Sequence, residues 1–383
     1  MKQAVPFLNR VRVENYRSIA SCEVAFTPLV VLLGPNGAGK SNFMDALRFV
    51  ADALATTPAD AVTRRGGLAE ILRQVPEPTD QFSIDLEFRV ATPEGLKQTG
   101  YGFTLGRDTT GRRPLVVKEE HCVIHQGQDK ESRFDVLAGL IVDGGGIERE
   151  RLYLPVAAAQ GDFSEVYYGL REMLFHHLDT DEMRQFQSDQ RTGRVGFSGE
   201  NIGTVLGELA FRYPVFKSRV DDYLQAIVPG ALGMDQRVYG TRSTVELRTN
   251  RGTQPFGPDA ISEGTLQAAG VLATLFQPAV LDGQATLIAI EEPETALHPA
   301  AIGALFDALT EASERVQIII TTQSADLLDH DDFDASWVRV VTMDGGLTII
   351  GDIDEAVRKV VDERLATLGE LMRDRQLRPR DSE

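Results

Sequence analysis

The stretch LVVLLGPNGAGKS, residues 29–41, decides the fold of this chain. Its first five residues form a continuous apolar run, as expected of a strand buried on both faces of a sheet. Gly34–Ser41 matches the P-loop pattern G-x-x-x-x-G-K-[ST] in full, and apolar residues repeat at helical spacing over 43–54. Because strand, glycine-rich turn and helix follow in this order, we expect a nucleotide phosphate site here.

Six residues of this turn carry the predicted nucleotide contacts: Asn36, Gly37, Ala38, Gly39, Lys40 and Ser41. The glycines let backbone N–H groups face the phosphates, and the start of the following helix adds its positive end. Lys40 is expected to reach the β- and γ-phosphates, and the Ser41 hydroxyl to bind Mg²⁺. ATP and Mg²⁺ are therefore the predicted ligands.

A second apolar run, LIAIEE at residues 287–292, ends in two acids. A buried strand of this kind delivers carboxylates to its C-terminal edge beside the P-loop, as a Walker B element does. We expect Glu291 to hold Mg²⁺, directly or through water. We expect Glu292 to orient and deprotonate the attacking water.

The rest of the chain divides into a β-rich part, a helical part and an alternating part. Residues 82–90 alternate apolar and polar side chains, and segments near 99–105 and 114–124 look like further antiparallel strands, followed by a loop at 139–150. Amphipathic helical stripes follow at 163–174, 202–209 and 216–227, and then a strand at 243–249. Beyond residue 262 helices and strands alternate, which favours a mainly parallel sheet, and one charged helix is expected over 353–373.

At this point the sequence resembles a family, the ABC-type ATPases. Residues 291–299, EEPETALHP, are similar to a Walker B plus D-loop in the form found in the RecF/OLD-like group, with His298 where many ABC proteins carry Asp. Residues 261–266, ISEGTL, resemble the ABC signature, in which Ser262 and Gly264 would form a helix start that binds a γ-phosphate. Ser262 is equally suited to being an ordinary helix N-cap.

Three further segments extend the resemblance. Residues 321–324, TTQS, resemble the switch segment, with Gln323 where most relatives carry histidine. A glutamine amide can still hydrogen-bond a phosphate or water but carries no charge, so slow hydrolysis is expected. The opening VENYRSI at 13–19 and the tail at 365–377 also resemble this group, whereas residues 60–240 resemble it least. For the Q-loop glutamine of the family, Gln74 and Gln160 are both candidates.

The resemblance implies an α/β fold: a P-loop NTPase with an ABC-type ATPase head, an antiparallel β lobe and a helical insertion. We expect the core to comprise residues 1–80 and 236–383, the β lobe 81–150 and the helical insertion 151–235. ABC-type sites combine the P-loop of one subunit with the signature of another. One copy of each motif per chain therefore predicts a homodimer around two ATP molecules.

The composition bears on the cellular compartment and on nucleic-acid binding. No secretion signal or membrane span is indicated, and two cysteines, Cys22 and Cys122, are too few for a disulfide framework, so a cytoplasmic protein is expected. The formal net charge of −18 argues against a generally DNA-coating surface. Short basic clusters could still form local nucleic-acid patches: Arg10, Arg12 and Arg17; Arg64 and Arg65; Arg112 and Arg113; Arg373, Arg375, Arg378 and Arg380.

Three functional hypotheses remain open at this stage. The first is an ATPase that gates a nucleic-acid process such as phage defence or DNA repair. Too few residues follow the switch for a Toprim nuclease, so a separate effector chain is expected, and His176 and His177 look like ordinary helix-face residues. The second is a transporter nucleotide-binding subunit, which the absence of an LSGGQ-type signature disfavours. The third is an SMC-like structural clamp, which would need long coiled-coil heptads that the chain lacks.

Overall fold

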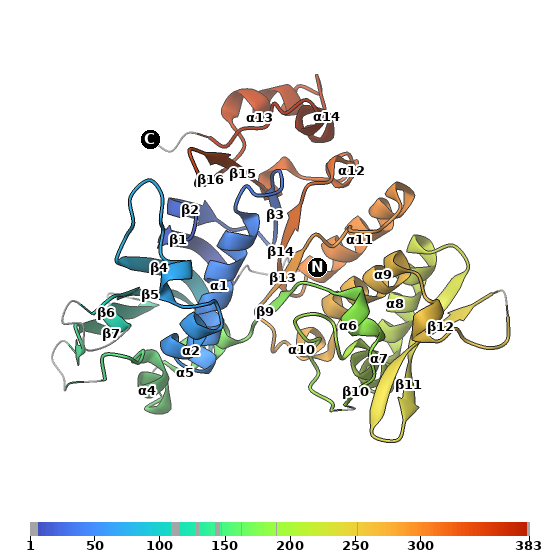
Figure 1. Cartoon of the computed structure of the whole chain (residues 1–383), viewed down its shortest axis with the longest axis horizontal. Helices are drawn as coiled ribbons and strands as arrows, with labels where there is room; N and C mark the ends of the chain where they lie inside the picture. The colour runs from blue at the N-terminus through green and yellow to red at the C-terminus, as the bar shows by residue number, and fades with distance from the viewer. Residues whose placement is uncertain are drawn as a thin grey trace.

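The computed structural model describes residues 7–108, 115–127, 130–141, 146, 148–161, 163–188, 190–250 and 252–380. A mainly parallel core sheet runs through the middle of the molecule (Figure 1). An antiparallel sheet lies on one side of it, a helical region on the other, and the C-terminal helices at one end. Helix α1 (Lys40–Ala55), which follows the P-loop, is packed between the two large sheets.

The core sheet has the strand order β16-β15-β3-β14-β13-β9, and only β16 runs antiparallel to its neighbour. Along β3, Val30 and Leu32 belong to the hydrophobic core around α1, whereas Leu29 and Val31 belong to the core of the helical region. Both faces are covered, which explains the unbroken apolar run. The strands are β3 (Leu29–Leu33), β9 (Met173–His176), β13 (Leu287–Glu291), β14 (Gln317–Thr322), β15 (Val338–Asp344) and β16 (Leu347–Gly351).

The antiparallel sheet has the order β2-β1-β4-β5-β6-β7-β8, so the antiparallel lobe of the expected fold is present, and it also includes β1 and β2, which precede the predicted residues 81–150. Along β4, Phe82, Ile84, Leu86 and Phe88 are buried in the core that surrounds α1, and the residues between them are partly or fully exposed. The strands are β1 (Leu8–Tyr16), β2 (Ile19–Ala25), β4 (Gln81–Thr92), β5 (Gly95–Gly106), β6 (Val116–Gly127), β7 (Lys130–Leu137) and β8 (Leu140–Ile141).

A buried glutamine joins the two large sheets. The side chain of Gln317, at the start of β14, accepts a hydrogen bond from Leu8 N (2.7 Å) and donates to Leu8 O (2.9 Å) and Thr27 O (3.0 Å). Short helices lie at this side of the molecule: α2 (Pro58–Thr63) and α5 (Ser164–Arg171) pack on α1, α3 (Leu68–Ile71) packs on α2, and α4 (Leu154–Ala159) packs on α5.

The helical region packs on the opposite face of the core sheet. Its helices are α6 (Thr180–Arg184), α7 (Ile202–Arg212), α8 (Pro214–Ile227), α9 (Glu263–Leu275), α10 (Pro278–Leu281) and α11 (Ile302–Ser313), with 3₁₀ turns η1 (Pro258–Ala260) and η2 (Pro299–Ala301). A small sheet accompanies them: β10 (Gln187–Ser188), β11 (Ala231–Tyr239) and β12 (Arg242–Thr249). Residues Glu263–Leu281 are long and apolar enough for a membrane span, but 89% of that window is buried inside the protein. This stretch comprises α9 and α10 and forms part of the core.

The C-terminal elements pack beside β15 and β16. They are α12 (Ala325–Leu328), the 3₁₀ turn η3 (Ala335–Trp337), α13 (Glu355–Asp362) and α14 (Leu368–Arg373). The single helix expected over 353–373 is therefore wrong. The backbone reverses at Arg364, with φ 55°, and Thr367 then starts α14 with a capping box to Glu370.

Two other expectations also need correction. Met173 and Leu174 do not continue a helical stripe. Helix α5 ends at Arg171, and both residues lie in β9, where pairing with β13 satisfies their backbone groups and overrides a short apolar periodicity. Strand β11 was not anticipated, whereas the strand expected at 243–249 lies within β12. Arg112 and Arg113 lie outside the described residues, as does part of the loop expected at 139–150, and the described part of that loop contains the short strand β8, which pairs with β7. The four-part division of the chain stays a prediction.

Candidate functional site

The P-loop has the conformation expected of a phosphate-binding turn. Gly39 adopts φ 102° directly before α1, a left-handed conformation that glycine tolerates. The buried ammonium of Lys40 donates to Gly34 O (2.7 Å) and Pro35 O (3.1 Å), so it lies against the start of the loop. Burial lowers the pKa of Lys40, and the neighbouring carboxylates of Glu292, Glu294 and Glu291 oppose that shift.

The loop is braced by residues from both ends of the chain. Thr348 of β16 donates its hydroxyl to Ala38 O (3.0 Å) and lies 2.7 Å from the hydroxyl of Ser18. The Asn42 amide donates to the same Ser18 oxygen (2.6 Å). A Cβ at Gly39 would lie 1.9 Å from the Thr348 hydroxyl oxygen, so no larger residue fits at this point. Of these bracing residues, Ser18 lies in the VENYRSI segment named from the sequence, whereas Asn42 and Thr348 lie in none of the motifs named there.

An oxygen-rich edge faces the start of α1. The Ser41 hydroxyl donates to Glu291 Oε2 at 2.7 Å. The contact arises because β3 and β13 both run parallel to β14 between them, so their C-terminal ends meet at one edge of the sheet. Hydroxyl and carboxylate oxygens are ligands that Mg²⁺ prefers, and this pair fits the predicted metal role.

The second acid of the motif lies at a turn in the backbone. Glu292 has φ 43°, and its N–H donates to Thr321 O (3.0 Å) and Thr321 Oγ1 (3.1 Å). Nearby, Glu294 accepts a hydrogen bond from the Thr322 hydroxyl, and burial raises its pKa. The end of β14 therefore fixes the backbone that carries both glutamates.

The structure brings to this edge a residue that sequence reasoning had set aside. His177 directly follows β9, not a helix face, and its Nδ1 lies 3.8 Å from Glu291 Oε2. Its backbone N–H donates to Phe197 O (2.9 Å), and Arg48 of α1 stacks on the Phe197 ring at 3.7 Å. The signal was hidden because β9 read as the end of a helical stripe.

Neither glutamine considered for the Q-loop hydrogen-bonds the P-loop or Glu291 among the described residues. The Gln74 amide donates to Ala69 O (2.9 Å) and Leu72 O (3.1 Å). Gln160 is exposed at the C-terminal end of α4.

The predicted signature and D-loop lie against each other. Ser262 is the N-cap of α9 and accepts from Thr265 N at 3.4 Å. A Cβ on Gly264 would lie 2.4 Å from Ala296 O, so the two backbones are in close contact. His298 caps η2 by accepting from Ala300 N at 3.2 Å. In the described part of the chain, no hydrogen bond joins Ser262, Gly264 or His298 to the P-loop of the same molecule.

Gln323 follows β14 and lines a cavity of about 550 Å³. Gly34 and Pro35 of the P-loop form one wall of this cavity, β15 another, and the chain after α14 a third, which includes Arg375. The predicted switch residue is thus beside the start of the phosphate loop.

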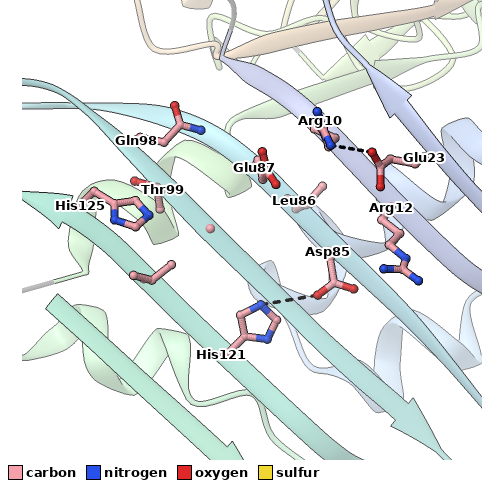
Figure 2. A pocket seen from close by; sticks show the side chains of 12 residues that line it. Arg10, Arg12, Glu23, Asp85, Leu86, Glu87, Gln98, Thr99, His121 and His125 are labelled. Carbon is pink, nitrogen blue, oxygen red and sulfur yellow. Dashed lines mark hydrogen bonds and ion pairs between the residues drawn. The ribbon is translucent and has the colours of Figure 1, made fainter. Parts of the chain in front are cut away.

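A second hollow, of about 540 Å³, lies on the open face of the antiparallel sheet (Figure 2). Arg10 pairs there with Glu23 (2.7 Å), and His121 Nε2 lies 3.5 Å from Asp85 Oδ1. Two arginines and three carboxylates line the hollow, so its charges largely offset one another and favour no strongly charged ligand.

Ion pairs likewise neutralise much of the basic clusters that the sequence suggested. Arg12 pairs with Glu14, Arg17 with Asp45, Arg65 with Asp45 and Asp52, Arg373 with Asp326 and Asp329, and Arg380 with Glu355. Only a minority of these arginines, Arg64, Arg375 and Arg378, are without an ion pair to a described carboxylate.

Two family models match the chain. One, described as "AAA domain, putative AbiEii toxin, Type IV TA system", matches residues 161–329. The other, described as "AAA ATPase domain", matches residues 7–135 and so includes the P-loop.

Known proteins and solved structures agree with these matches. The DNA replication and repair protein RecF of Porphyromonas gingivalis is 29% identical over 134 residues, which cover 33% of this chain and only 37% of that protein. An SMC head bound to the C-winged helix domain of ScpA aligns with TM-score 0.54 at 15% identity, over 90% of this chain and 97% of that one. An SMC head with an extended coiled coil from Pyrococcus furiosus, bound to the C-terminal domain of ScpA, aligns with TM-score 0.53 at 14% identity, over 94% and 100%. The chain therefore matches AAA ATPase family models over two stretches, resembles RecF over a third of its length, and shares the fold of SMC head P-loop ATPases.

Proposed function

We propose that this protein binds and hydrolyses ATP, and that two copies close around the nucleotide. One observation carries the proposal: Ser41 at the start of α1 and Glu291 at the end of β13 meet at 2.7 Å beside the ammonium of Lys40. A P-loop serine, a lysine and a strand-end acid in this arrangement are the parts that phosphoryl transfer needs.

Each residue has a distinct role in this proposal. The P-loop N–H groups and Lys40 hold the phosphates, and the lysine then exchanges its contacts to Gly34 O and Pro35 O for phosphate oxygens. Ser41 and Glu291 hold Mg²⁺, which neutralises phosphate charge when bound. Glu292 takes the proton of the attacking water. Gln323 orients that water or the terminal phosphate through its neutral amide.

Dimerisation follows from where the remaining motif lies. Ser262 and Gly264 make no hydrogen bond to their own P-loop among the described residues, and Gly264 packs instead against the D-loop at Ala296. A surface built from the start of α9 and the D-loop suits the γ-phosphate held by a second copy. ATP would then stabilise the closed pair, and hydrolysis would release it.

The wider role that we propose is to gate a nucleic-acid process. The RecF relative is a DNA replication and repair protein, and the description of one matching family model refers to a toxin of a type IV toxin–antitoxin system. Both support a role in DNA repair or phage defence. The solved SMC heads are bound to domains of ScpA, which supports a separate effector or partner chain here. The acidic net charge of −18 favours control of such a partner over broad coating of DNA.

The test uses the purified full chain and its isosteric variant Glu292→Gln. We expect the variant to keep ATP affinity, to form an ATP-dependent dimer by light scattering, and to lose hydrolysis by about 10²–10⁴-fold, the usual contribution of a general base. Glu314→Gln, an exposed acid at the end of α11, is the matched control and should behave as wild type.

Two further variants separate the parts of the proposal. Lys40→Ala should abolish nucleotide binding, and Ser262→Arg should keep binding but lose ATP-dependent pairing and turnover. Unchanged turnover in Glu292→Gln would remove that residue from its role. Normal hydrolysis by Ser262→Arg would refute the composite site.

A further inference from the structure

The residues that line the cavity at Gln323 include a positively charged side chain and no carboxylate. Its walls include Gly34 and Pro35 of the P-loop, Gln323 of the switch, and Met372, Arg375 and Leu377 of the tail. Among the described residues that line it, Arg375 is the charged one, and no carboxylate faces the cavity. A cation without a counter-ion beside a phosphate loop favours an anion.

Arg375 and Arg378 differ in this respect from Arg373 and Arg380 of the same tail, and of these two only Arg375 lines the cavity. Arg373 pairs with Asp326 (2.7 Å) and Asp329 (2.8 Å), and Arg380 pairs with Glu355 (2.7 Å). Arg375 makes no ion pair with any carboxylate in the described ranges. No described carboxylate therefore neutralises this arginine, which lines the cavity.

The tail that carries Arg375 is fastened to the switch. The two Arg373 ion pairs and the hydrogen bond from Thr367 Oγ1 to Asp329 Oδ1 (2.6 Å) join α14 to the segment that starts at α12. Helix α12 begins directly after Ser324, so it continues the switch segment. Beyond α14, Arg375 N donates to Met372 O (3.0 Å), which closes the turn at that residue.

We infer that Arg375 binds the terminal phosphate of ATP from the tail side of the site, and so supplies the positive charge that Gln323 lacks. This inference rests on the proposed ATPase function. A guanidinium is permanently charged and can donate two parallel hydrogen bonds to a phosphate. The neutral amide of Gln323 contributes hydrogen bonds but no charge. The tail and the switch together then respond to whether a third phosphate is present.

The test compares affinities for ADP and for a non-hydrolysable ATP analogue, both with Mg²⁺, by titration calorimetry on the full chain. We expect Arg375→Ala to weaken binding of the analogue by about tenfold or more, as for a lost hydrogen bond to a charged group. We expect its ADP affinity to change less than about twofold. Arg378→Ala is the matched control, because Arg378 is also exposed and unpaired among the described residues but does not line the cavity. It should alter neither affinity.

A double variant tests whether Arg375→Ala weakens binding because it removes a positive charge. Adding Gln323→His to Arg375→Ala should restore part of the analogue affinity below about pH 6.5, where an imidazole is protonated, and less above it. Equal weakening of both nucleotides by Arg375→Ala, or no weakening at all, would overturn the inference while the ATPase proposal stands. If the wild type binds neither nucleotide, both fall.

Discussion

Replacing Gly264 with alanine tests the contact between the signature and the D-loop. The added methyl carbon would lie 2.4 Å from Ala296 O, whereas real Cβ contacts essentially never fall below 3.0 Å. The blocking atom belongs to the backbone, so the D-loop must move by roughly 0.6 Å or more. Overpacking of this kind costs about 1–3 kcal/mol, and alanine regains up to about 1 kcal/mol over glycine in a helix. We expect the free energy of unfolding to fall by about 1 kcal/mol.

The larger effect should be on pairing. Position 264 and the D-loop form the surface that we propose meets the second copy, so a displaced D-loop should prevent ATP-dependent dimerisation. The assay is urea denaturation without nucleotide, followed by light scattering with ATP in the Glu292→Gln background. Nucleotide affinity of the monomer should stay within about twofold, because Lys40 and Ser41 are untouched.

The control for this experiment is Gly257→Ala. Gly257 lies just before η1, has φ −73°, and a Cβ there meets nothing within 4 Å. Its variant should stay within about 0.5 kcal/mol of the parent and pair normally. If Gly264→Ala pairs as well as Gly257→Ala does, the surface around Gly264 is not part of the dimer contact and the reasoning fails.

Three other predictions concern the frame around the site. Lys217 is buried between Asp221 (2.8 Å) and Asp235 (2.9 Å), so Lys217→Met should lower the free energy of unfolding by about 3 kcal/mol. Lys359→Met, at an exposed ion pair, should change it by under about 1 kcal/mol, and equal effects of the two variants in urea titrations would contradict the prediction. Burial lowers the pKa of His176 to about 4, so the unfolded chain binds a proton before the folded chain does as the pH falls below 6.5. Between pH 7.5 and 5.0 the wild type should therefore lose about 2 kcal/mol more stability than His176→Asn, and equal losses in the two proteins would refute this prediction. Thr348→Val removes the hydroxyl that donates to Ala38 O, so it should lower the free energy of unfolding by about 1–2 kcal/mol and weaken ATP binding. Thermal melts and nucleotide titrations that match those of the wild type would show that this hydrogen bond is dispensable.

Local pattern was enough to predict the centre of the fold. The apolar runs at β3 and β13 read as buried strands because both faces of each are covered. The Ser41–Glu291 contact could be expected as well, because strands that run in one direction bring their C-terminal ends to the same edge.

Contacts between distant segments could not be predicted in the same way. Met173 and Leu174 fit a helical spacing, and only the neighbouring β13 makes them a strand, which in turn places His177 beside Glu291. The break before α14 did leave a signal, since Thr367 and Glu370 have capping-box spacing. No local signal marks the approach of Gly264 to Ala296, because it depends on how two loops pack.

The brace at Ala38 also sets the order in which the protein can mature. Thr348 follows Ala38 by 310 residues, and Gln317 follows Leu8 by 309. During synthesis the P-loop and Ser18 emerge early, but Thr348, which donates to Ala38 O, emerges only 310 residues after Ala38. A nascent chain therefore lacks a fully supported phosphate loop until β16 has been made.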